Sequence, residues 1–177
     1  MNPLDTVNGT IIAGVILSIL IGVLSMGAAF NVASLIVWIH VLSGITWIGL
    51  LYYFNFVQAP ALAEAAADEG GPGGAGITKY VAPRALWWFR WGALVTWLSG
   101  AAYLAHLGIL GDAFMLTGTS SVIGVGAWLG TIMLFNVWGL IWPNQKKILG
   151  IVEATADDIA KARRTAFLAS RANTVLS

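Results

Sequence analysis

The chemistry that this sequence offers most clearly lies in two histidines, His40 and His106, each of which sits inside an apolar stretch. They are the only histidines among the 177 residues. An ionisable side chain is costly inside a bilayer and usually marks a site with a partner. Neutral imidazole is also the commonest metal ligand in proteins. The two side chains therefore indicate a site where membrane helices hold a ligand.

Haem b is the cofactor that this pair favours, because two imidazoles facing each other across a helical bundle hold a haem without a covalent bond. The chain has no cysteine, which excludes disulfides, thiolate metal sites and attachment of a c-type haem. Two alternatives stay open. Each histidine can instead hydrogen-bond a serine between helices, such as Ser43 or Ser99. His106 can also lie in interfacial water without a function.

Four more residues are predicted to contact the cofactor. Gly44 and Trp47 continue the helical face of His40, and Gly44 has no side chain to keep a flat macrocycle, or another helix, at a distance. Tyr103, one turn before His106, can donate a hydrogen bond to a propionate or a substrate. Arg90 can bind an anionic group or stack on a tryptophan, unless it only extends to the inner headgroups. The sequence assigns no catalytic residue.

The elements that position these residues are predicted from composition. The chain is 58% hydrophobic and 10% charged, whereas soluble domains carry about 25% charged residues. Four apolar runs are long enough to cross about 30 Å of hydrocarbon, at residues 10–30, 33–57, 86–110 and 122–142. We therefore expect an all-α integral membrane four-helix bundle over residues 1–150, followed by a basic cytoplasmic helix over 151–177.

The basic residues predict the orientation of these spans. Three of the nine lie between or at the edge of the second and third runs, and six follow the fourth. The positive-inside rule then places both termini and the loop 58–85 on the cytoplasmic side of the membrane. Both histidines come to lie near the outer face. The nine are Lys79, Arg84, Arg90, Lys146, Lys147, Lys161, Arg163, Arg164 and Arg171.

Several chemistries lack support in the sequence. It has no glycine-rich phosphate loop, no nucleophile elbow and no carboxylate pair within a span. Proton pumping through a buried carboxylate is therefore not expected. The lipid bilayer is the first partner, and no nucleic acid is expected to bind.

Four segments of the chain resemble a known family. They are HVLSGITWIGLLYYFNFVQ at 40–58, YVAPRALWWFRWGALVTWLSG at 80–100, FNVWGLIWPNQKKILG at 135–150 and ASRANTVLS at 169–177. They are similar to the membrane domain of the bacterial membrane-bound urate hydroxylases, the urate oxidase N-terminal family. The pattern of histidine, glycine and tryptophan along one helix resembles more loosely the four-helix, haem-binding membrane protoporphyrinogen oxidases of bacteria.

The resemblance implies a membrane domain coupled to electron transfer. In full-length members a C-terminal cytochrome c would take the electrons released when urate becomes 5-hydroxyisourate. His40 matches the motif position where a haem ligand is expected. This chain has no cysteine for a cytochrome c module, so we expect a short or truncated form that needs a separate acceptor, such as a periplasmic cytochrome c.

Two functions of different classes follow. The first is a membrane b-type haem redox protein that passes electrons from a small molecule, urate by resemblance, to an outside acceptor. The second is a non-catalytic accessory subunit of a larger respiratory or photosynthetic complex, whose small-residue and aromatic faces would pack against partners. A transporter is less favoured, because the spans show no pair of broken helices.

Overall fold

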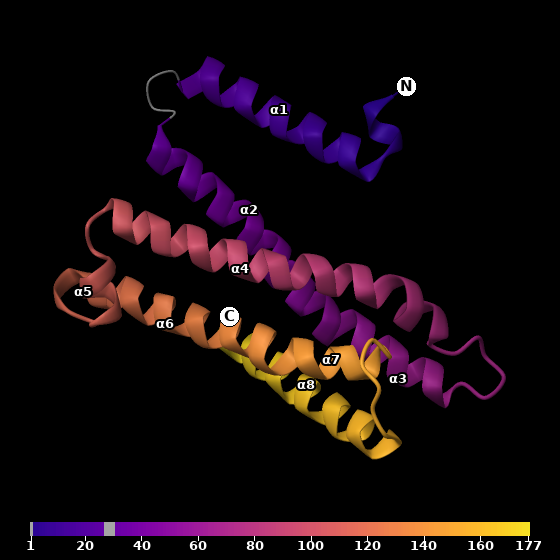
Figure 1. Cartoon of the computed structure of the whole chain (residues 1–177). Helices are drawn as coiled ribbons and strands as arrows, with labels where there is room; N and C mark the ends of the chain where they lie inside the picture. The colour runs from indigo at the N-terminus through magenta and orange to yellow at the C-terminus, as the bar shows by residue number, and fades with distance from the viewer. Residues whose placement is uncertain (1, 27–30) are drawn as a thin grey trace. The chain divides into compact units, whose positions relative to one another are not determined.

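The computed structural model describes residues 2–26 and 31–177, and within them all regular structure is helical (Figure 1). This confirms the predicted all-α class. The chain divides into two compact units, one up to Ile36 and one over Val37–Ser177.

The first unit contains a short 3₁₀ helix, η1 (Pro3–Asp5), and the apolar helix α1 (Val7–Met26). Twenty residues rise about 30 Å, the thickness of the hydrocarbon core. The helix α2 (Val32–Tyr52) begins in this unit and continues into the next. Asn31 caps it, since the Asn31 side-chain oxygen accepts from the N–H of Ser34 at 3.1 Å. The end of the predicted run 10–30 lies outside the described residues.

The second unit is built from long helices, three of which contain a π-helical turn. The helix α2 runs on through η3 (Tyr53–Gln58) into α3 (Ala59–Ala67), and η4 (Ile77–Val81) leads into α4 (Ala82–His106). The region 58–85, expected to connect the second and third spans, is mostly helical. Only residues 68–74 form a turn there.

After α4 the chain reverses direction, runs back as one long helix and reverses again before α8 (Figure 1). The short elements α5 and η5 connect α4 to a continuous helix formed by α6, η6 and α7, and α8 follows after a turn. Their bounds are α5 (Leu110–Phe114), η5 (Gly118–Ser120), α6 (Ser121–Phe135), η6 (Asn136–Ile141), α7 (Trp142–Ile148) and α8 (Ala156–Leu176).

Each π-helical turn comes directly before a proline, and proline chemistry explains it. Pro60, Pro83 and Pro143 each stand at the second position of the helix that follows a π-turn. Proline has no N–H and its ring crowds the carbonyl four residues earlier. The wider turn relieves this by pairing each carbonyl with the N–H five residues on, as from Phe54 to Ala59 and from Val137 to Trp142.

The core of the second unit lies where α2, α4, α6 and α8 meet. Leu51 and Phe89 are its most deeply buried large side chains. The buried members are Trp47, Leu51, Leu86, Phe89, Ala93, Met133, Val137, Ile141 and Ala169.

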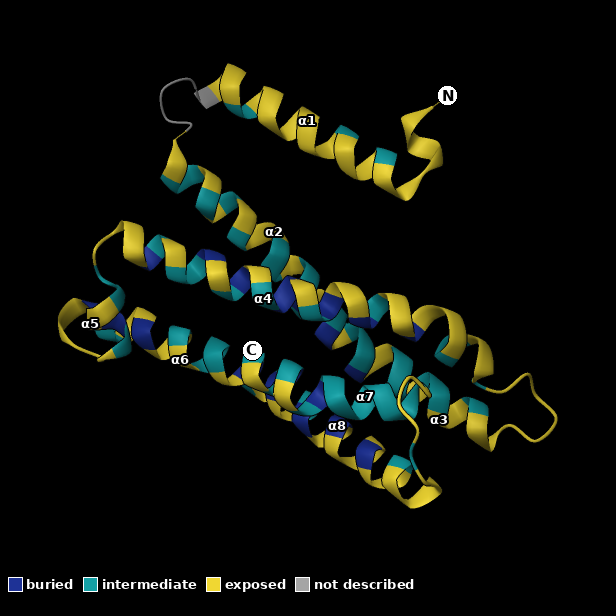
Figure 2. Ribbon diagram, viewed as in Figure 1, coloured by how far each residue is buried: buried dark blue, intermediate teal, exposed yellow. Residues whose placement is uncertain are grey.

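The C-terminal helix α8 packs against the bundle, whereas the sequence suggested a solvated tail. Its alanines Ala162, Ala166 and Ala169 are buried, and it lies along α7 and η6 (Figure 2). Asn173 is completely buried, accepts a hydrogen bond from the Asn136 amide at 2.8 Å and donates to the Met133 carbonyl at 3.0 Å. Small side chains on one face explain the close contact between these helices.

Within residues 2–26 and 31–177, three helical stretches are long and apolar enough to cross a membrane, which supports a multi-pass membrane protein. They are Val7–Ser25, Val32–Ala67 and Gly118–Ile148. The predicted third span, 86–110, corresponds to α4, which ends at His106 and falls outside this set. Arg84, Arg90 and four tryptophans lower the mean hydropathy of α4.

Candidate functional site

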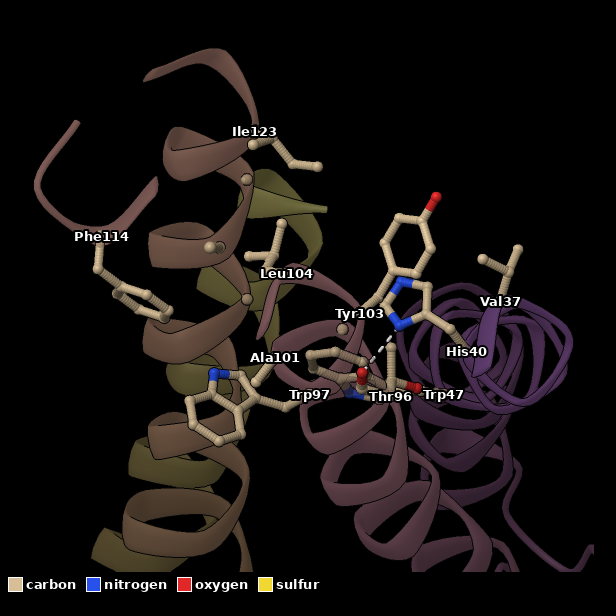
Figure 3. Close-up of a pocket in the computed structure, with 14 residues that line it drawn as sticks. Val37, His40, Trp47, Thr96, Trp97, Ala101, Tyr103, Leu104, Phe114 and Ile123 are labelled. Atoms are coloured by element: carbon tan, nitrogen blue, oxygen red, sulfur yellow. Dashed lines mark hydrogen bonds between the residues drawn. The ribbon is translucent and has the colours of Figure 1, made fainter. Parts of the chain in front are cut away.

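A largely apolar cavity of about 500 Å³ lies between α2, α4 and α6 and contains His40 in its wall (Figure 3). We call it the His40 cavity. Its volume falls within the range of ligand pockets, roughly 300–1,000 Å³. The lining residues are Val37, His40, Trp47, Thr96, Trp97, Gly100, Ala101, Tyr103, Leu104, Phe114, Ile123, Gly126, Ala127 and Gly130.

The His40 imidazole is oriented by a backbone carbonyl of α4. Its Nδ1 lies 2.9 Å from the carbonyl oxygen of Thr96, drawn as the dashed line in Figure 3, and 3.3 Å from the Ser99 hydroxyl. A carbonyl oxygen only accepts, so Nδ1 carries the proton. In the neutral ring Nε2 then holds the lone pair, and no described residue hydrogen-bonds to it. This arrangement is typical of a metal-ligating histidine, whose other nitrogen donates to a fixed acceptor.

Glycines allow α4 to lie this close to α2. A Cβ added at Gly100 would come within 3.0 Å of the His40 Cε1 and 3.3 Å of its Nδ1. At Gly92 an added Cβ would lie 3.4 Å from the backbone of Ser43 and Trp47. The predicted Gly44 also faces α4, but a Cβ there would only reach ordinary contact, 3.7 Å from Thr96. Close approach therefore depends mainly on glycines of α4.

Two further polar groups border the cavity. Trp47 is 4% exposed, and its buried indole N–H has no acceptor among the described residues. Buried donors without a partner are rare in proteins and suggest a missing ligand or water. Tyr103 is half-buried in the cavity wall. His40, Trp47 and Tyr103 are thus brought together by the fold.

The structure does not bring His106 into this cavity. It is exposed at the last position of α4, ten residues and about 15 Å along the axis from Thr96. The pairing of both histidines on one cofactor stays a prediction, and this geometry gives it no support.

Arg90 lies outside the cavity and stacks on an aromatic ring. Its guanidinium carbon is 3.7 Å from the centroid of the Trp142 ring. The indole N–H of Trp138 also donates to the Arg90 carbonyl at 3.2 Å. The cation–π alternative weighed from the sequence is therefore realised in the structure.

Sequence reasoning missed three parts of the site. Gly100 and the Thr96 carbonyl define the orientation of His40, and the wall opposite α4 comes from Gly126, Ala127 and Gly130 of α6. Gly126 and Gly130 are four residues apart and form a small-residue stripe on α6, which favours close helix packing. That stripe was the only available signal for the α6 wall, because a backbone carbonyl leaves no trace in residue types.

Comparison with known proteins identifies a family for the part of the chain that contains His40. The family model described as urate oxidase N-terminal matches residues 28–122, more than half of the chain. No curated protein and no solved structure matches. The matched region includes His40, Gly100 and Tyr103, while the α6 wall of the cavity lies beyond it.

Proposed function

Because the chain belongs to the urate oxidase N-terminal family, we propose that it is a membrane b-type haem redox protein whose His40 would hold the haem iron. The observation that carries this proposal is the protonated Nδ1 of His40, held by the Thr96 carbonyl at 2.9 Å. It leaves Nε2 as a ligand in an apolar cavity large enough for an organic cofactor.

The residues present fit a haem on one face. Apolar walls from α4 and α6 suit a flat, mainly hydrophobic ring, and Gly126 and Gly130 leave room for it. The unpartnered indole N–H of Trp47 and the Tyr103 hydroxyl are donors for its polar edge. Among the described lining residues, His40 is the only nitrogen ligand for iron. A single protein ligand is therefore the arrangement that fits.

A bound haem would supply one-electron transfer. The protein's own residues would set the basicity of the His40 ligand and the reduction potential of the haem. The Thr96 carbonyl raises the basicity of His40 by accepting from Nδ1, and the apolar walls exclude water from the iron. Both are known determinants of haem potential.

We propose an orientation with the His40 cavity toward the outer face. The charge distribution supports it, because the described loop at 107–120 carries no basic residue, whereas Lys146, Lys147 and Arg163 lie at the opposite end of the second unit. In this arrangement α4 is a fourth span, both termini are cytoplasmic, and the membrane is a bacterial inner membrane.

Urate is the proposed electron donor, and it rests on the family name alone. Its oxidation releases electrons and therefore needs an acceptor. A periplasmic cytochrome c would approach from the proposed outer face, close to the His40 cavity.

The test compares His40→Ala with His106→Ala in protein expressed with haem available. We expect His40→Ala to lose most of the bound haem, measured as pyridine haemochrome per chain, while His106→Ala retains it. Equal loss in both variants would restore the shared-ligand arrangement. Full haem content in His40→Ala would refute the proposal, and haem-free wild-type protein would favour an accessory subunit.

A further inference from the structure

A second cavity of about 480 Å³ lies in the same unit, at the end opposite the His40 cavity. We call it the Gln58 cavity. All three π-turn regions contribute to it, through Gln58, Thr78 and Ile141. π-turns occur frequently at functional sites. The helices α3, α7 and α8 complete the wall.

Helix length places this cavity at the depth of lipid headgroups. The apolar stretch Val32–Ala67 has 36 residues, which rise about 54 Å, whereas the hydrocarbon core is about 30 Å thick. Counted from Val32, Asn55 lies about 35 Å along this axis, just beyond the hydrocarbon. Exposed aromatic residues of η4 and the first two turns of α4, Tyr80, Trp87 and Trp88, mark the same interface.

The polar part of the cavity carries positive charge and amide groups. Arg163 lines it, and no acidic side chain does so among the described residues. Arg171 extends the positive charge, since its guanidinium donates to the Asn55 carbonyl at 3.3 Å. The remaining polar lining residues are Asn55, Gln58, Thr78, Gln145 and Ser170.

Two buried polar atoms close to this cavity have no hydrogen-bond partner among the described residues. They are the side-chain oxygen of Gln58, a lining residue, and Nε of Arg171, whose guanidinium contacts Asn55. A buried polar group without a hydrogen bond destabilises the folded protein, so a ligand that supplies the bond is favoured. Gln58 lines the cavity, and an amide oxygen can accept a hydrogen bond from a ligand hydroxyl.

The opposite part of the cavity is apolar. Leu62, Leu86 and Phe89 line it together with Ile148 and Phe167. An occupant therefore combines an anion, hydroxyl donors and hydrocarbon within one molecule.

We propose that the Gln58 cavity binds the headgroup of an anionic glycerophospholipid with free hydroxyls, of which phosphatidylglycerol is the simplest. The phosphate faces Arg163, the glycerol hydroxyls donate to Gln58, and the first acyl carbons lie against the apolar wall. Basic pockets between membrane helices on the cytoplasmic side bind such headgroups. This site is independent of the haem proposal.

The test is the melting temperature of the detergent-purified full chain titrated with phosphatidylglycerol or phosphatidylcholine. We expect a saturable increase with phosphatidylglycerol only. Arg163→Gln should weaken the apparent affinity about fivefold, the equivalent of about 1 kcal/mol per basic residue. Arg164→Gln is the matched control, because Arg164 is exposed and does not line the cavity.

A second variant separates binding from folding. Gln58→Leu removes an unsatisfied oxygen, so the lipid-free melting temperature should stay equal or rise, while the affinity for phosphatidylglycerol falls. Equal lipid affinity in Arg163→Gln and Arg164→Gln would overturn the site. An equal increase with soluble glycerol 3-phosphate would overturn the lipid as its source and identify a site for a free anion.

Discussion

At the scale of single residues, the site depends on how α4 presents its backbone to His40. The Thr96 carbonyl sets the tautomer, and Gly100 provides the space for the ring. Backbone groups of the cavity wall therefore control the candidate ligand, because they determine where the imidazole lies.

The first prediction concerns Gly100→Ala. The new Cβ would lie 3.3 Å from the His40 Nδ1, so the ring must shift and its hydrogen bond to Thr96 must lengthen. We expect a shifted haem absorption maximum and a weaker retention of haem on dilution. Gly49→Ala is the control, since an added Cβ there meets nothing within 4 Å. Identical spectra for the two variants would show that Gly100 does not position the ligand.

Residue types gave part of this site. His40 and Trp47 could be placed on one helical face from spacing alone, and both line the cavity. His106 was matched to His40 by depth, but its side chain is exposed. Whether His106 faces the cavity depends on the rotation of α4 about its axis. That rotation follows from the contacts of Gly92 and Gly100 with α2, which cannot be predicted from the sequence pattern of α4 alone.

At the scale of elements, α8 begins with a capping box. Thr155 accepts from the Asp158 N–H at 3.2 Å and donates to its carboxylate at 2.9 Å. The hydrogen bond from the Thr155 hydroxyl is the main reason that the pKa of Asp158 lies below its ordinary value. A lowered pKa in the folded state means that this stabilisation is complete at neutral pH and is lost as pH falls through that pKa.

The second prediction follows for Thr155→Ala. Loss of the cap should lower stability at neutral pH by about 1 kcal/mol, and the pKa of Asp158 should return toward its ordinary value. As the pH falls from neutral to below the usual range of aspartate, the melting temperature of Thr155→Ala should therefore fall by less than that of wild type. Melting temperature against pH measures this, with Thr165→Ala, at an exposed position, as the control. Parallel curves for wild type and Thr155→Ala would contradict the account.

The third prediction concerns the docking of α8. Asn173→Ala removes the acceptor of the Asn136 side-chain amide and one of the donors to the Met133 carbonyl, at a cost of about 1–3 kcal/mol. We expect a lower melting temperature and faster tryptic cleavage at Arg163 and Arg164. Val175→Ala, at an exposed position, should behave as wild type. Unchanged cleavage in Asn173→Ala would mean that the α8 contact is not held by this residue.

Elements were predicted unevenly, for physical reasons. Long apolar runs located α1, α2 and α6 well, because length and hydropathy suffice for a membrane helix. The docking face of α8 consists of alanines and Asn173, which give almost no hydrophobic pattern. Helix also replaced most of the expected loop 58–85, since the π-turns let the chain pass Pro60 and Pro83 without ending the helices.

At the scale of the whole second unit, the two cavities lie at opposite ends and differ in character. The His40 cavity is largely apolar and contains one oriented imidazole, whereas the Gln58 cavity combines an apolar wall with a polar part that includes Arg163. The basic residue at the Gln58 cavity is what the positive-inside rule expects at the cytoplasmic end in the proposed orientation.

The fourth prediction tests that orientation. The natural absence of cysteine lets single cysteines report on topology without background. Met115→Cys, in the loop after α4, should react with a membrane-impermeant maleimide on spheroplasts. Ile151→Cys, in the turn before α8, should react only after the membrane is opened. Both positions are exposed, so the reverse labelling pattern would invert the proposed topology.

The most direct test of the central claim is the reduced-minus-oxidised absorption spectrum of the purified wild-type protein, with haem measured per chain. The account predicts a b-type spectrum at close to one haem per chain. A folded protein expressed with haem available that shows no such spectrum would contradict it, and the His40 cavity would then need another occupant.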